Sequence, residues 1–172
     1  MNEDKIRLVE GWTDKASNQL NSAKQHFKSQ VYYSEAIQAA QECIELSVKS
    51  ILLQLNITFS QSHGWGPDKK QFNNIAEQIQ NRQLIKRLTD QHLNYSVDLP
   101  RLLFLVNFWS HFYITAKYGF EAGYLASAKD LFKREEAELA IQHANECYQA
   151  ASLLRHLDKE KLDLLLTNKN KG

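Results

Sequence analysis

The sequence has few of the residues that interrupt regular structure, with only two prolines and six glycines in 172 residues. A protein built from many strands needs frequent turns, so this scarcity argues against a β fold and favours long helices joined by few loops. The chain also lacks a Gly-rich phosphate loop, a Cys-x-x-Cys pair, a His-Glu-x-x-His motif and a Gly-x-Ser-x-Gly motif. We therefore predict no metal site and no cofactor, and any nucleotide must be bound by side chains.

A strong net charge and a long apolar run are missing as well. The formal net charge is +1, which provides no global field for attracting nucleic acid or a membrane. Residues Met1 to Lys5 are polar and acidic, and no apolar stretch that could serve as a signal or anchor follows them. Cys43 and Cys147 fall within apolar helical patterns, so we predict buried, reduced thiols. The sequence thus predicts a cytoplasmic protein that makes no membrane contact.

What the sequence does contain is the hydrophobic periodicity of helices, with apolar residues recurring at three- and four-residue steps. This spacing predicts helices over residues 6–27, 33–55, 72–88, 102–118 and 137–154. The helix over 72–88 has the weakest pattern and is expected to be broken, whereas Asp98 and Pro100 form a cap and first turn for the next helix. We predict an all-α fold, an antiparallel bundle of four to five helices over residues 1–158. A short C-terminal helix and a frayed tail are expected over 159–172.

Several segments occur in an order that resembles the HEPN family, small helical-bundle domains found beside nucleotidyltransferases and in RNA-targeting defence systems. The segments that carry the resemblance are Trp12–Ala16, Ala40–Lys49, His63, Tyr113–Gly119 and Glu136–Ala144. The resemblance extends from about Trp12 to Leu154 and implies a HEPN-like bundle. Two positions depart from the family pattern, because Lys117 replaces the usual arginine and Gly119 replaces the usual proline.

The resemblance implies a protein that binds a nucleotide, RNA or a nucleotidyltransferase partner. Two alternatives remain, a metal-independent ribonuclease or toxin that uses His111, and a purely structural helical adaptor. The helix over 102–118 is apolar on nearly every side and carries Phe104, Phe108, Trp109 and Phe112. One bundle is not expected to cover so many aromatic side chains, so we also predict a homodimer.

Polar residues of this same helix are the main candidates for chemistry. At about 100° per residue, five of them fall within roughly a third of its circumference. They are Asn107, Ser110, His111, Lys117 and Tyr118. A histidine exchanges protons near neutral pH or binds a phosphate as a cation, and a lysine holds phosphate charge. The alternative reading is that His111 is a satisfied core or interface residue.

The family's ribonucleases place an arginine before the histidine, with four to six residues between the two. None of the corresponding positions, Val106, Leu105 and Phe104, is basic. Asn107, His111 and Tyr113 resemble the asparagine, histidine and tyrosine that follow that arginine in toxin members. A catalytic site of His111 and Asn107 would therefore lack its phosphate clamp. The stretch from Arg87 to His92 has the required spacing, but chance also produces such a spacing in a chain of this composition.

A second candidate lies on the helix over 33–55, where Gln41, Glu45 and Lys49 are four residues apart and share one face. One reading is a solvated helix pair of little consequence. The other, which depends on the family signature, is a polar strip facing a groove or a dimer mate. Under that reading Glu45 and Lys49, together with His63, join Ser110, Tyr113, Lys117 and Tyr118 as candidate nucleotide- or RNA-binding residues.

Overall fold

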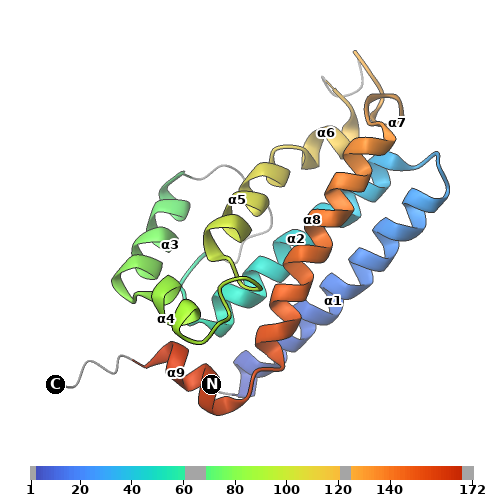
Figure 1. Cartoon of the computed structure of the whole chain (residues 1–172). Helices are drawn as coiled ribbons and strands as arrows, with labels where there is room; N and C mark the ends of the chain where they lie inside the picture. The colour runs from blue at the N-terminus through green and yellow to red at the C-terminus, as the bar shows by residue number, and fades with distance from the viewer. Residues whose placement is uncertain (1–2, 61–68, 121–124, 168–172) are drawn as a thin grey trace.

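The described residues form an all-α bundle, as the periodicity predicts. The computed structural model describes residues 3–60, 69–120 and 125–167. Its helices are α1 (Glu3–Lys28), α2 (Tyr33–Gln54), α3 (Lys69–Asn81), α4 (Leu84–Asp90), α5 (Leu99–Ser110), α6 (Tyr113–Tyr118), α7 (Ala128–Leu131), α8 (Arg134–Arg155) and α9 (Lys159–Leu166) (Figure 1). Strand-like pairing within these ranges is limited to a bridge between Phe120 and Ala126. No helix in the same ranges is long and apolar enough to span a membrane.

The long helices α1, α2 and α8 pack side by side, with α1 running opposite to the other two (Figure 1). Their contact faces are rich in alanine, and small side chains let helix backbones approach closely. The Cys43 thiol of α2 donates to the Ala144 carbonyl oxygen of α8 at 3.6 Å. The fully buried alanines of these helices are Ala16, Ala23, Ala36, Ala40, Ala137, Ala140, Ala144 and Ala151.

Both cysteines are free and buried, which confirms the prediction of unpaired thiols. Burial raises the pKa of the Cys43 thiol to about 12, against a weaker opposing hydrogen bond from Ser47. Burial likewise raises the pKa of the Cys147 thiol well above its usual value. Because the thiolate is the reactive form, both cysteines are packing residues and not nucleophiles.

The helix predicted over 102–118 is not continuous, because α5 ends at Ser110 and α6 begins at Tyr113. At the junction the Phe112 amide donates to the Trp109 carbonyl oxygen at 3.0 Å, a three-residue step that tightens the last turn of α5. The Ser110 hydroxyl donates to the Asn107 carbonyl oxygen at 2.7 Å, and such bonds back to the preceding turn bend helices. The predicted cap is confirmed, since a carboxylate oxygen of Asp98 accepts from the Arg101 amide at 3.2 Å.

The third predicted helix is broken, as its weak pattern suggests. α3 and α4 meet at Gln83, whose φ of 52° is left-handed and incompatible with a continuous helix. The preceding Arg82 donates from Nη1 to the carbonyl oxygens of Leu55 at 2.6 Å and of Asn56 at 3.0 Å. A cation at the C-terminal end of α2 complements both the unpaired carbonyls and the helix dipole. Arg82 thereby attaches the α3–α4 unit to the central helix.

α9 is attached to α4 in the same way. Arg87 donates from Nη1 to the carbonyl oxygens of Leu165 at 3.0 Å and of Thr167 at 2.6 Å. Leu165 is fully buried, whereas Leu164 is exposed. The short C-terminal helix is therefore anchored by the buried side chain of Leu165 and by the hydrogen bonds from the Arg87 guanidinium.

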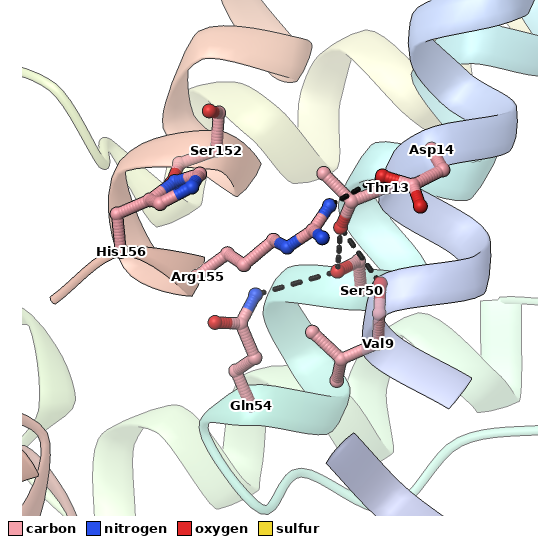
Figure 2. A network of polar contacts seen from close by, with 8 residues as sticks. All are labelled: Val9, Thr13, Asp14, Ser50, Gln54, Ser152, Arg155 and His156. Carbon is pink, nitrogen blue, oxygen red and sulfur yellow. Dashed lines mark hydrogen bonds and ion pairs between the residues drawn. The ribbon is translucent and has the colours of Figure 1, made fainter. Parts of the chain in front are cut away.

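A buried polar network links α1 to α2 (Figure 2). The Thr13 hydroxyl of α1 lies 2.9 Å from the Ser50 hydroxyl of α2, and the Gln54 amide donates to Ser50 at 3.3 Å. These three side chains are at most 2% exposed, so their mutual bonds offset the cost of removing them from water. Beside them Arg155 extends from α8 and forms an ion pair with Asp14 of α1 (Figure 2).

Candidate functional site

An open groove between α3 and α5 brings together the two residues predicted to be catalytic. Its volume is about 480 Å³. Asn107 of α5 and His111, the residue that caps the C-terminal end of α5, are one turn apart and line the groove together, and α3 contributes Asn73. The remaining lining residues are apolar, namely Phe72, Ala76, Leu103 and Phe104. The predicted proximity of Asn107 and His111 is thus present in the structure.

A second, apolar cavity of about 490 Å³ lies next to the groove. Ala76 and Leu103 line both spaces, so the two are neighbours along α3 and α5. The other residues of the second cavity are Ile79, Gln80, Gln83, Ile85, Lys86 and Pro100. The groove therefore presents amides and an imidazole, and the neighbouring cavity presents mainly apolar surface.

The positions that carry an arginine in the family's ribonucleases contribute no cation to this groove. Val106 and Leu105 are 1% and 0% exposed and belong to the core. Phe104 is the only one of the three that lines the groove beside His111, and it is 57% exposed. Arg87 donates to carbonyl oxygens of α9, away from these linings. Among the described residues the groove therefore has a histidine without an arginine.

The candidates near the end of the predicted helix form a separate cluster on α6. The Lys117 ammonium lies 5.6 Å from the centre of the Tyr113 ring and 5.2 Å from that of Tyr118. Hydrogen bonds to the hydroxyls of Tyr118 and then Tyr113 raise the pKa of Lys117, so this exposed amine keeps its charge. The prediction of one polar face from Asn107 to Tyr118 on a continuous helix is wrong, because the turn at His111 and Phe112 interrupts it.

The strip on α2 is buried, which overturns the reading of a solvated pair. Lys49 Nζ lies 2.7 Å from Glu45 Oε1, and the two side chains are only 4% and 12% exposed. Gln41 Nε2 donates to the other oxygen of Glu45 at 3.3 Å. One turn earlier Gln38 donates to the Ala116 carbonyl oxygen of α6 at 2.8 Å, which places this side of α2 toward α6. His63, the family position beyond α2, lies outside the described residues.

A histidine that sequence reasoning did not single out fixes α5 against α8. Trp109 Nε1 donates to His143 Nδ1 at 3.0 Å, and Trp109 is 3% exposed. Burial, followed by the charge of Arg101, lowers the pKa of His143, which keeps the accepting nitrogen unprotonated. Arg101 forms a bidentate ion pair with Glu146 at 2.5 and 2.9 Å. No local pattern predicts this set, because its members meet only when α5 and α8 pack together.

The expectation that Trp109 is one of several aromatics left uncovered is therefore wrong. Phe108 and Phe112 are half-buried, and Phe104 alone of the four is exposed. The rings pack against one another, with centres 5.3 Å apart for Phe108 and Phe112 and 5.6 Å apart for Trp109 and Phe112. The bundle covers most of this aromatic surface by itself.

A comparison with protein families decides the relationship of the chain. The model of the HEPN domain matches residues 9–155. The chain belongs to the HEPN domain family. A comparison with curated proteins found no significant match, and neither did a comparison with solved structures.

Membership of the HEPN family points to an RNA-related or nucleotidyltransferase-associated function. The match begins within α1 and ends at the last residue of α8, so it contains the groove and the α6 cluster but not α9. Gly119 marks a departure of this HEPN domain from the family pattern. Its φ of 86° is one that a proline ring cannot adopt, so the chain leaves α6 by a turn that proline would not permit.

Proposed function

We propose that this HEPN protein binds a nucleotide or single-stranded RNA in the groove between α3 and α5 without cleaving it. The observation that carries the proposal is the placement of Asn107 and His111 side by side in an open groove whose described lining contains no arginine. Specific binding of unpaired nucleotides uses stacking surfaces and hydrogen-bonding groups, and both are present here. This choice ranks binding above the metal-independent ribonuclease and above the structural adaptor.

Cleavage needs more than His111 supplies. Metal-independent RNA hydrolysis requires a proton acceptor, a proton donor and positive groups that stabilise charge developing on the phosphate. His111 is able to transfer a proton, but the positions of the family arginine are buried or occupied by Phe104. Lys117 lies beyond the turn that ends α5, where its contacts are with Tyr113 and Tyr118.

The experiment is a binding and cleavage assay in EDTA. Fluorescein-labelled single-stranded RNA and mononucleotides are titrated with the purified full chain, and the RNA is then analysed for cleavage. We expect micromolar or tighter binding that weakens in His111→Gln and intact RNA throughout. His156→Gln is the matched control, because His156 is an exposed histidine at the C-terminal end of α8 whose ring nitrogen is bonded to the Ser152 carbonyl oxygen. Cleavage that depends on His111 would support the ribonuclease, and no binding of any nucleotide or RNA would support the adaptor.

We also propose that the protein is a homodimer that associates through α6 and the bridge that follows it. Large apolar side chains are exposed there, with Ile114 at 61%, Phe120 at 48% and Leu125 at 70%. Contiguous exposed apolar surface marks interaction sites. Light scattering at micromolar concentration should give a dimer that Ile114→Glu dissociates, while Leu139→Glu, on the exposed face of α8, leaves it intact. A monomeric wild type would instead leave this surface for a partner such as a nucleotidyltransferase.

A further inference from the structure

We propose that the groove between α3 and α5 is a nucleobase subsite, in which Phe104 stacks on the base and the carboxamides of Asn73 and Asn107 hydrogen-bond to its edge. The proposal rests on the proposed function and goes further, because it assigns recognition to the base and not to the phosphate. It also names two residues, Phe104 and Asn73, that no motif of the sequence indicates.

The shape of the groove suits a planar ligand of this size. Its volume of about 480 Å³ lies within the range of about 300 to 1,000 Å³ that is typical of small-molecule sites. Such sites are lined mostly by apolar and aromatic side chains with a few polar groups that orient the ligand. Here Phe72, Ala76 and Leu103 supply the apolar lining, and the polar groups come from both helices.

Phe104 is positioned as a stacking ring. It is 57% exposed, whereas the next two residues of the helix, Leu105 and Val106, are buried. Its ring stacks on that of Phe108, with centres 5.8 Å apart and planes inclined by 27°, and Phe108 packs in turn on Trp109. One face of Phe104 is thus supported from within the protein. Stacking on a base is a specific use for an aromatic ring that is held rigidly and left open to a groove.

The two carboxamides match what a base edge offers. Each carries an NH₂ donor and a carbonyl acceptor, and every base presents both donors and acceptors along its Watson–Crick edge. Within the described part of the chain, neither Asn73 nor Asn107 forms a side-chain hydrogen bond. The neighbouring Asn74, by contrast, is engaged by Gln78 at 2.6 Å. The groove amides are therefore available to a ligand.

The charge of the groove agrees with base recognition. Among the residues that the structure describes, its lining contains no Lys, Arg, Asp or Glu, and His111 is the one titratable side chain. Binding driven by phosphate contacts falls steeply with salt, because counterions are released for each contact. Recognition through stacking and amide hydrogen bonds releases no counterions from phosphates, so it does not depend on salt in this way. We therefore expect the part of the affinity that depends on Phe104 to persist between 50 and 200 mM salt.

The test compares the full chain on three probes: a single-stranded RNA 12-mer, an abasic oligomer of the same length, and a free mononucleotide. The variants are Phe104→Ala and Asn73→Ala, each at an exposed position that the fold tolerates. Tyr95→Ala and Asn21→Ala are controls, since Tyr95 is an exposed aromatic residue outside the groove and Asn21 is exposed on α1. Removing a stacking ring should weaken RNA binding by about 5- to 150-fold.

We expect Phe104→Ala and Asn73→Ala to lose affinity for the 12-mer while binding the abasic oligomer as the wild type does. Both controls should bind like the wild type. The free nucleotide shows whether one base suffices or whether a strand is needed. Equal affinity of the wild type for the 12-mer and the abasic oligomer would overturn the nucleobase subsite and leave the proposed function standing. Failure to bind any of the probes would overturn both.

Discussion

Replacing Lys49 with methionine tests whether the buried ion pair of α2 is a structural device. Methionine keeps the length of the aliphatic stem but removes the charge, so the Glu45 carboxylate, 12% exposed, loses its partner at 2.7 Å. Leaving one charge of a buried pair uncompensated costs about 3 to 5 kcal/mol. The Gln41 amide still donates to Glu45 at 3.3 Å, so we expect the loss of stability to lie at the lower end of this range. At about 3 kcal/mol, the midpoint of thermal unfolding should fall by about 10 °C.

The assay is thermal and urea unfolding, each followed by circular dichroism at pH 7 and a fixed protein concentration. The double variant Glu45→Gln with Lys49→Met removes both charges and should recover most of the loss, because a neutral pair of similar volume needs no counterion. Lys15→Met is the matched control. Lys15 pairs with Glu42 at the same 2.7 Å, but the two side chains are 53% and 39% exposed, so its removal should cost less than about 1 kcal/mol.

The reasoning fails if Lys49→Met unfolds at the wild-type urea concentration, or if Lys15→Met is destabilised as much. In the first case the pair would be solvated in solution. In the second case burial would not be what distinguishes the two pairs. If Lys49→Met is less stable than the wild type and the double variant is destabilised equally, Lys49 stabilises the fold through contacts other than that with Glu45.

Three further predictions concern other parts of the molecule. Burial and then the charge of Arg101 lower the pKa of His143 below its usual 6.5, so the unfolded chain binds this proton more readily than the folded chain. Stability should therefore fall as pH drops below about 6.5. In His143→Gln, the thermal unfolding midpoint should depend less on pH between 7.5 and 5. Val106→Arg should unfold or aggregate, losing about 3 to 5 kcal/mol, since position 106 is 1% exposed, whereas Phe104→Arg should keep the wild-type circular dichroism spectrum. Arg87→Ala should release α9, seen as faster proteolytic cleavage after Arg155 with the remaining bundle intact.

The long helices could be predicted from the sequence because their apolar stripes are regular. Ile37, Ile44 and Ile51 of α2 follow a seven-residue step and are all at most 1% exposed. The break between α5 and α6 could not be predicted in the same way. The apolar residues around it extend over every face, so the periodicity carries no information, and neither proline nor glycine marks the turn.

The candidate site could be predicted only within one helix. Asn107 and His111 share a face because they are four residues apart, and the structure places both in the groove. Asn73 belongs to another helix, and its position depends on how α3 stands relative to α5. The same limit explains why the sequence left two readings for Glu45 and Lys49, since an ion pair four residues apart has the same pattern whether that face meets water or another helix.

The alanine-lined contacts of α1, α2 and α8 determine where this domain is able to change during evolution. Where alanines such as Ala40 and Ala144 set the distance between backbones, each added methylene pushes two helices apart and costs about 1 to 3 kcal/mol. The walls of the groove face open space, so residues there are able to grow or shrink without moving a helix. Variation in size and chemistry should therefore accumulate along α3 and the exposed face of α5. A ligand preference could in this way diverge among related chains while the three-helix core keeps its spacing.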